Sequence, residues 1–166
     1  MNSHLRSGII AATAVLVLDQ ASKLWLLFVF DIGHHRGGVS VTPFLDLVLA
    51  WNPGISFGWF QDDSLLAQFI LTAIKAVAVI VLAIWMARSR TLLATVALGL
   101  IIGGATGNAI DRLAYGAVVD FALFHVEFGG NTYHWYVFNL ADVAIVAGVA
   151  ALLYDSLLGV PAAKAP

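Results

Sequence analysis

Carboxylate and amide side chains gather at a few points of a chain that is otherwise strongly apolar. Asn139 and Asp142 lie three residues apart, a spacing that places both on one face of a helix. Asp120 precedes them and could fold back against Asp142. Two facing carboxylates in a low-dielectric setting tend to share one proton, so that one can accept a proton from water while the other donates to a carbonyl oxygen. The spacing alone leaves open whether Asp120 and Asp142 meet.

Two further polar groups lie inside or at the ends of apolar stretches. Asp19 and Lys23 are four residues apart with the acid first, the favourable order for an intrahelical ion pair. This pair could be purely structural or part of a site. Asn108, Asp111 and Arg112 fall within about one helical turn, where a helix cap or an interfacial ion cluster is the alternative to a functional role. Lys75 has no obvious carboxylate partner in its own helix, and its role stays undetermined.

Other catalytic chemistries lack their residues. The chain has no cysteine, which excludes disulfides, thiolate metal sites and cysteine nucleophiles. Neither Ser22 nor Ser56 lies in a Gly-x-Ser-x-Gly turn. No His-Glu-x-x-His zinc motif occurs, and four histidines are expected in outer loops without ligand spacing: His34, His35, His125 and His134. A proton shared by two aspartates would supply both acid and base, so we expect neither a metal nor an organic cofactor.

The composition indicates whether the chain that carries these polar groups lies in water or in a membrane. Of 166 residues, 61% are hydrophobic and only 11% are charged, and the mean hydropathy is +0.92. Soluble domains carry roughly a quarter charged residues, so this composition indicates a membrane protein. The formal net charge of -2 provides no basic field for nucleic acid.

Four apolar stretches are long enough to cross a bilayer, which takes about 20 residues each. They cover residues 8–30, 64–87, 91–111 and 136–159 of one membrane domain, 1–166. Asp19, Gln20 and Lys23 interrupt the first stretch, so it is expected to be an uncleaved span and not a secretory signal. A stripe of Gly99, Gly103 and Gly107 in the third predicts close helix packing.

Basic residues and strand-like segments predict the topology. Four basic residues are expected on the cytoplasmic side with both termini: Arg6, Arg88, Arg90 and Lys164. Segments 31–63 and 112–135 then lie outside, where residues 39–42, 44–49 and 118–124 predict a small sheet at the outer membrane surface. Six aromatic residues are typical of an interfacial belt: Trp51, Trp59, Phe60, Tyr133, Trp135 and Tyr136.

The polar islands, taken together and in order, resemble those of bacterial lipoprotein signal peptidase, or signal peptidase II. They are Asp19-Gln20-x-x-Lys23, Asn52-Pro53-Gly54-Ile55-Ser56-Phe57-Gly58, Gly103-Gly104-Ala105-x-Gly107-Asn108-x-x-Asp111-Arg112, Val119-Asp120-Phe121 and Phe138-Asn139-x-Ala141-Asp142. The match extends from residue 19 to residue 142. Ser56 stands where the family usually has alanine, and both residues are small.

This resemblance implies an intramembrane aspartic endopeptidase of the bacterial inner membrane. Such an enzyme cleaves diacylglyceryl-modified prolipoproteins on the N-terminal side of the lipidated cysteine, near the outer face of the membrane and in contact with its lipids. The implied fold is an all-α membrane protein of four transmembrane helices with a small extracytoplasmic β-sheet, the cradle, and a short mobile outer helix around residues 54–66. The catalytic aspartates would be Asp120 and Asp142, and Asp19 and Lys23 would form a structural ion pair. The substrate-binding or supporting residues would be Asn52, Gly54, Asn108, Asp111, Arg112 and Asn139.

Two other classes of protein remain as alternatives. A small proton-coupled transporter could use ionisable residues within its spans as a relay, but it predicts polar groups spread through the membrane depth. Here most of them cluster towards the outer end, and only Asp19, Lys23 and Lys75 lie deeper. A structural protein that dimerises through its glycine stripe would leave the aspartates unexplained.

Overall fold

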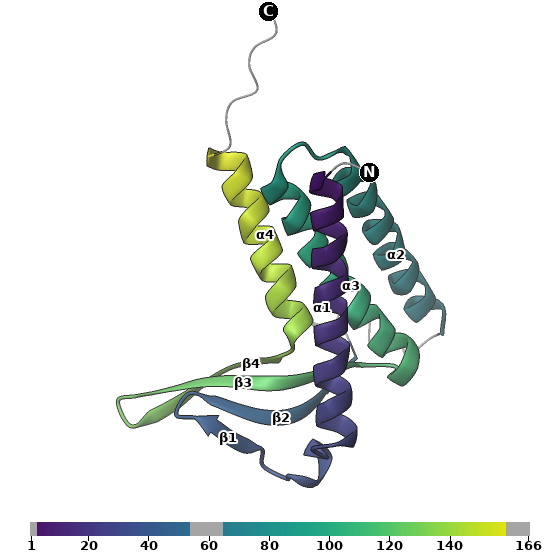
Figure 1. The fold of residues 1–166 in the computed structure, drawn as a ribbon. Helices are drawn as coiled ribbons and strands as arrows, with labels where there is room; N and C mark the ends of the chain where they lie inside the picture. The colour runs from purple at the N-terminus through teal and green to yellow at the C-terminus, as the bar shows by residue number, and fades with distance from the viewer. Residues whose placement is uncertain (1–2, 54–64, 159–166) are drawn as a thin grey trace, which may run out of the picture.

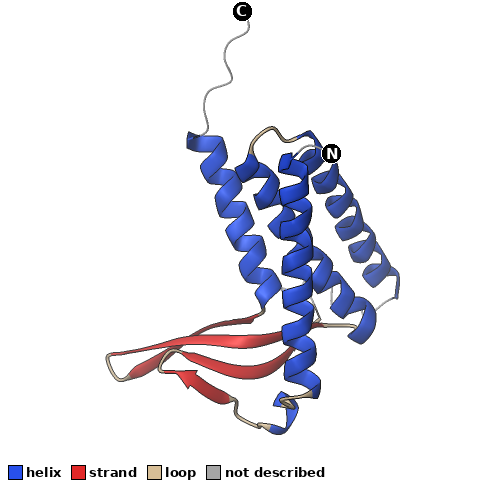
Figure 2. Cartoon of the chain, viewed as in Figure 1, coloured by secondary structure: helices blue, strands red, loops and turns tan. Residues whose placement is uncertain are grey.

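The computed structural model describes residues 3–53 and 65–158. Helices lie side by side, and one antiparallel sheet crosses the end of the bundle (Figures 1 and 2). The elements in chain order are α1 (Ser3–Phe28), the 3-10 helix η1 (Ile32–His34), β1 (Val39–Thr42), β2 (Leu45–Asn52), α2 (Leu65–Arg88), α3 (Leu92–Tyr115), β3 (Val118–Phe128), β4 (Asn131–Phe138) and α4 (Leu140–Leu158).

Three helices among the described residues, α1, α3 and α4, are long and apolar enough to cross a membrane. Large apolar side chains on α1 face outwards, including Ile10 at 56% exposed and Leu18 at 59%. Such surfaces can be covered by lipid, whereas their exposure to water would be unfavourable. Helix α2 contains 24 residues. Several side chains in its first half, including that of Lys75, are not among those the structure describes. The count of four spans stays a prediction.

Helix α3 lies between the other helices, and its glycines allow the close approach that their spacing predicts. Gly99 contacts Gly8 of α1, and Gly103 contacts Ala12. On another face, Gly104 lies against Ala141 of α4. Because these contacts involve the neighbouring backbone, a side chain at the glycine positions would push the helices apart.

We expect Gly103→Ala to destabilise the protein by about 1–3 kcal/mol, the usual cost of overpacking. An added Cβ would approach Val15 Cβ to 2.9 Å and lie even closer to the Ala12 carbonyl oxygen. The control is Gly33→Ala, where the new Cβ would meet only Leu49 Cδ2, at 3.8 Å. Thermal unfolding in detergent measures both variants. Equal midpoints for the two would contradict this account of α3 packing.

The sheet has the order β1-β2-β3-β4, with every neighbouring pair antiparallel. The three strands predicted from the sequence are present, although β2 begins at Leu45 and β3 continues to Phe128. The register places Ala50 beside Asp120 and Asn52 beside Val118. Strands β2 and β3 therefore bring together two polar islands that are far apart in the sequence.

The fourth strand and the helix ends correct the predicted boundaries. Residues 136–138 belong to β4, so the last helix begins at Leu140 instead of residue 136. The turn at Gly129 and Gly130, both with positive φ, lets the chain reverse and pair an aromatic run with β3. Helix α3 continues beyond residue 111 until Gly116, whose φ of 75° ends it. Helix α1 spans residues 3–28 instead of 8–30.

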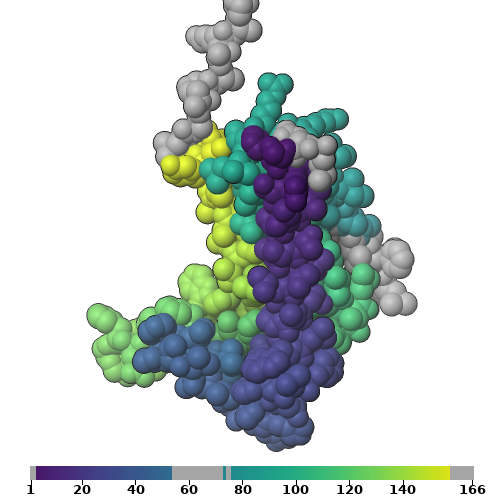
Figure 3. Space-filling model, in the orientation of Figure 1, coloured from purple at the N-terminus to yellow at the C-terminus, as the bar shows by residue number. Residues whose placement is uncertain are grey.

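The β3–β4 hairpin projects away from the helices (Figure 3). It exposes Tyr133, Trp135 and Tyr136, which are 56%, 67% and 81% accessible. Trp51 on β2 is 47% exposed, while Trp59 and Phe60 lie outside the described residues. The exposed rings are available for the interfacial belt, which stays a prediction.

Candidate active site

Asp120 lies on β3 in a buried position, 2% exposed. Two asparagines donate to its carboxylate: Asn52 Nδ2 to Oδ2 at 3.0 Å and Asn139 Nδ2 to Oδ1 at 2.6 Å. The donors come from β2 and from the residue that precedes α4. Pairing of β2 with β3 thus places one donor, and pairing of β4 with β3, which sets Phe138 opposite Ala122, places the other.

Asp142 lies in the first turn of α4 and is half-buried. Its Oδ2 accepts from the Asn139 backbone N–H at 3.1 Å, and Asn139 Oδ1 accepts from the Asp142 N–H at 3.0 Å. This reciprocal pair has the geometry of a capping box, which explains the three-residue spacing. Asn108 Nδ2 of α3 donates to Asp142 Oδ1 at 2.9 Å. The three-residue spacing of Asn139 and Asp142 therefore serves two purposes: the two residues cap α4, and both belong to the candidate site.

Asn139 connects the two aspartates. Its side-chain amide donates to Asp120 while its Oδ1 and backbone N–H bond Asp142. The same amide donates to Asn108 Oδ1 at 3.0 Å, and Asn139 is 1% exposed. Asp120 and Asp142, whose meeting the sequence left open, thus share one hydrogen-bond network.

Burial raises the pKa of the Asp120 carboxyl above its ordinary value, and the nearby Asp142 carboxylate raises it further. The hydrogen bond from Asn52 opposes this effect and lowers the pKa, as does the bond from Asn139. Because the first cause is the largest, Asp120 holds its proton at a pH where an ordinary carboxyl has lost it.

The ion pair of Asp19 and Lys23 is present, with 2.9 Å between Nζ and Oδ2. The lysine side chain, 2% exposed, also pairs with Asp111 Oδ2 at 2.7 Å and donates to Asn108 Oδ1 at 3.1 Å. Gln20 Nε2 donates to Asp111 Oδ1 at 2.9 Å. The Asp19–Lys23 pair predicted within one helix is therefore part of a larger polar cluster, which joins α1 to α3.

Both buried acids of this cluster also hold the backbone beside the candidate dyad. Asp111 Oδ2 accepts from the Val119 N–H at 3.1 Å, and Asp19 Oδ1 accepts from the Ala141 N–H at 3.0 Å. Val119 immediately precedes Asp120, and Ala141 immediately precedes Asp142. The ion cluster thereby positions both candidate catalytic residues. Sequence patterns carry no signal for these backbone contacts.

Arg112 supplies a positive charge at the same place. It interacts electrostatically with Asp120, Asp111 and Asp142. Its Nη1 donates to the Asn108 carbonyl at 3.1 Å, and its buried Nε has no hydrogen-bond partner among the described residues. The guanidinium can therefore balance negative charge that develops between the aspartates.

An apolar cavity of about 230 Å³ adjoins Asn139. Residues from α1, the sheet and α4 line it: Ser22, Phe121, Ala122, Phe138, Asn139, Leu140 and Val143. Its walls suit a hydrophobic group next to the dyad. Ser22 donates its hydroxyl to the Asp19 carbonyl at 2.7 Å.

Some predicted residues lie outside the described part of the chain, and others occupy a different element from the one expected. Gly54, Ser56 and the proposed mobile element lie outside the described residues, apart from the first residues of α2. The loop position expected for two histidines was wrong, because His125 and His134 lie on β3 and β4 with their ring centroids 5.8 Å apart. Within the described part of the chain, no three histidine, aspartate or glutamate side chains form a group that could hold a metal ion.

Comparisons with known sequences agree on one family. A family model described as signal peptidase (SPase) II matches residues 11–158. A lipoprotein signal peptidase of Nitrobacter hamburgensis is 77% identical over 162 residues, which cover 98% of this chain and 98% of that protein. One from Methylorubrum extorquens is 52% identical, covering 97% of this chain and 90% of its own.

Two solved structures, each described as a bacterial membrane enzyme, share the fold. One aligns with a TM-score of 0.69 at 30% identity and covers 95% of this chain and 94% of that chain. The other has a TM-score of 0.74 at 28% identity, with coverage of 92% and 94%. The helices with their small sheet therefore form an arrangement already seen in membrane enzymes.

Proposed function

Because the chain belongs to the signal peptidase II family, we propose that it cleaves its substrate by an aspartic mechanism in which Asp120 and Asp142 form the catalytic pair. The chain is a protease that removes signal peptides from prolipoproteins, and it is a multi-pass protein of the bacterial inner membrane. The transporter alternative has no support among these matches.

The observation that carries the mechanism is the shared bonding of Asn139 to both carboxylates. Burial raises the pKa of the Asp120 carboxyl and so favours its protonated form, while Asp142 caps the N-terminus of α4, where negative charge is favoured. Asp142 then accepts a proton from water, whose oxygen attacks the peptide carbonyl carbon, and Asp120 donates its proton to the carbonyl oxygen. When the tetrahedral gem-diol collapses, the C–N bond breaks and the protonated Asp142 donates to the leaving amine. Asp120 recovers its proton from the gem-diol.

The substrate we propose is a diacylglyceryl-modified prolipoprotein, cut on the N-terminal side of the lipidated cysteine. The apolar cavity beside Asn139 supports this assignment, since a hydrophobic signal helix and its lipid approach through the membrane. Purified protein in detergent should convert such a prolipoprotein to two products, and mass spectrometry would detect the loss of the signal peptide. The same prolipoprotein without the lipid should remain uncut. Equal cleavage of both forms would contradict the lipid requirement.

A fourth span through α2 and cytoplasmic termini belong to the same proposal. The start of α1, the α2–α3 connection and the end of α4 lie at one end of the bundle, opposite the sheet (Figure 1). We expect reporters fused at Arg90 or Lys164 to be cytoplasmic and a reporter fused after Leu65 to be external. Alkaline phosphatase and fluorescent-protein fusions measure this. A cytoplasmic signal from the Leu65 fusion would invert the orientation and the location of the site.

The bond from Asn52 predicts a pH effect of definite sign. Because this bond lowers the pKa of Asp120, Asn52→Ala should raise it, so that Asp120 loses its proton at a higher pH. The alkaline limb of the kcat/KM profile should therefore move to higher pH. The control Asn131→Ala, at the start of β4 and far along the hairpin from Asp120, should leave both limbs in place. An alkaline limb that stays fixed or moves to lower pH in Asn52→Ala would argue against Asp120 as the proton donor.

A further inference from the structure

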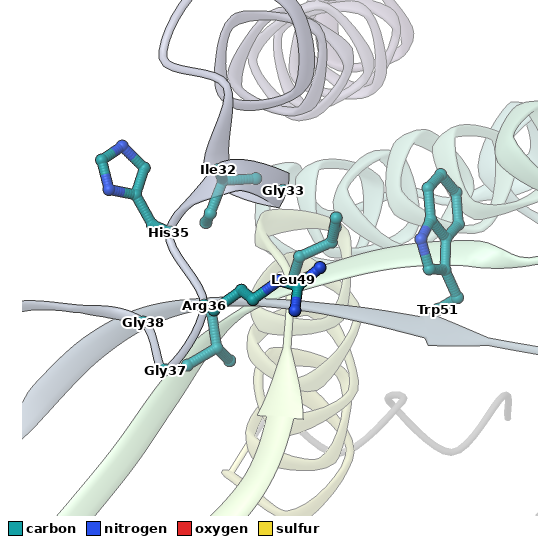
Figure 4. Close-up of a pocket in the computed structure, with 9 residues that line it drawn as sticks. Ile32, Gly33, His35, Arg36, Gly37, Gly38, Leu49 and Trp51 are labelled. Carbon is teal, nitrogen blue, oxygen red and sulfur yellow. The ribbon is translucent and has the colours of Figure 1, made fainter.

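A second cavity, of about 350 Å³, lies between the α1–β1 connection and β2 (Figure 4). Its volume is within the range of small-ligand sites, about 300–1,000 Å³. The lining residues are Ile32, Gly33, His35, Arg36, Gly37, Gly38, Val48, Leu49 and Trp51. None of these residues belongs to the proposed catalytic pair or its hydrogen-bond network.

Arg36 is the only lysine, arginine, aspartate or glutamate in this lining. Its side chain extends beside Leu49, while the His35 ring is directed away from it (Figure 4). The guanidinium makes no hydrogen bond or ion pair with any residue in 3–53 or 65–158. Asp31, in the same α1–β1 connection, pairs with His34 at 2.6 Å, and Asp46 on β2 accepts from the Ser40 hydroxyl at 2.5 Å. Arg36 is exposed, and a guanidinium without a partner in the described residues can bind an anion that accepts several of its donors; phosphate has this geometry.

Four of the other lining residues are apolar, whereas His35 and the glycine backbones add polar surface. Ile32 is buried at 2% exposure, Val48 and Leu49 are half-buried, and Trp51 presents its ring at 47% exposure. A free inorganic anion would gain nothing from these four apolar side chains, whereas a phosphate attached to an apolar body would bury surface against them. The cavity therefore fits an amphiphile.

The position of the cavity points to a membrane lipid. It adjoins the end of α1, where Phe28 and Val29 are 69% and 72% exposed. The rings of Trp25, Phe30 and His35 stack there with centroids 5.4 and 4.9 Å apart. In membrane proteins, aromatic rings and basic side chains at the end of a span lie at the level of the lipid headgroups.

We propose that this cavity binds the headgroup of an anionic glycerophospholipid, with the phosphate on Arg36 and the first apolar atoms against Leu49 and Trp51. The site is separate from the chemistry assigned to Asp120 and Asp142, and its occupancy can be measured without any cleavage assay. A carboxylate in the substrate beyond the cleavage point is the competing occupant.

The test uses the full chain in a neutral detergent, titrated with dioleoyl phosphatidylglycerol or with dioleoyl phosphatidylcholine. Native mass spectrometry counts the lipids retained. We expect phosphatidylglycerol to bind preferentially, about tenfold more weakly in Arg36→Gln, and with intermediate affinity in Arg36→Lys. The matched control Arg88→Gln, at the end of α2, should bind like the wild type. Equal retention by the wild type and Arg36→Gln, or no preference over phosphatidylcholine, would overturn the proposal.

A second variant keeps Arg36 and fills the cavity. A Cβ at Gly33 would meet only Leu49 Cδ2, at 3.8 Å, so that Gly33→Leu can fold and place its side chain in the space. We expect it to lose phosphatidylglycerol although the arginine remains, and wild-type retention in this variant would overturn the proposal. So would full displacement of the lipid by equimolar inorganic phosphate, which would indicate a free-anion site. A third contrary result is unchanged lipid binding in Arg36→Gln with slower cleavage of substrates that are acidic after the cysteine. That result would assign the cavity to the substrate.

Discussion

Asp120→Asn and Asp142→Asn should each lower kcat/KM for a lipidated prolipoprotein by about 10²–10⁴-fold, the usual contribution of a general acid or base. Asparagine keeps the size of the side chain but removes the exchangeable proton that the mechanism requires. Because the two carboxylates act as one unit, the double mutant should be scarcely slower than either single mutant. Cleavage rates measured by mass spectrometry at saturating and limiting substrate provide kcat and kcat/KM.

The matched control is Asp46→Asn. This half-buried carboxylate lies on β2, where it bonds Ser40 and approaches His125 Nδ1 to 3.4 Å, outside the network of Asn139. It should retain turnover near that of the wild type, and all variants should still bind substrate. An Asp120→Asn protein with near wild-type turnover would remove Asp120 from the mechanism and the aspartic assignment with it.

Lys23→Met should destabilise the protein by about 3–5 kcal/mol, the cost of leaving buried charges without their partner. Its ammonium pairs with Asp19 and with Asp111, both 1% exposed or less. Adding Asp19→Asn should recover only part of the loss, because Asp111 stays unpaired. The triple variant with Asp111→Asn should recover more. Denaturant titration in detergent gives the free energy of unfolding for the series.

Arg88→Met, which removes an exposed cation at the end of α2, should change stability by no more than about 0.5 kcal/mol. Cleavage should fall in Lys23→Met even where folding persists, since Asp19 and Asp111 also hold the backbone N–H groups beside the dyad. If Lys23→Met were as stable as the triple variant, the buried ion cluster would not contribute to folding.

The features that the sequence determined by itself are local. Composition identified a membrane protein, because the length and apolarity of a run show, without any tertiary contact, that it can span a bilayer. The Asp19–Lys23 pair follows from helix geometry over four residues, and the structure confirms it. The strand-like patterns of residues 39–42, 44–49 and 118–124 predicted three strands that are present. The order of the polar islands was sufficient to identify one family by resemblance.

The boundaries of β4 and α4 were not visible in the same way. Tyr136, Val137 and Phe138 are equally suitable for the start of an apolar span and for a strand. Pairing of Ala122 with Phe138 and of Leu123 with Val137 decides for the strand. That choice depends on a partner strand that the local pattern does not contain.

The assembly of the site was decided only by tertiary structure. Lys23 meets Asp111 across 88 positions of chain, and Asp19 meets the Ala141 N–H across 122. Asn139 bonds Asp120 because β4 pairs with β3 up to Phe138, opposite Ala122, immediately before α4 begins. Periodicity reports which face of one element is polar, whereas contacts between elements depend on how closely the backbones pack. Here glycines on α3 set that distance, and the buried charges must then find each other because neither lipid nor apolar core can solvate them.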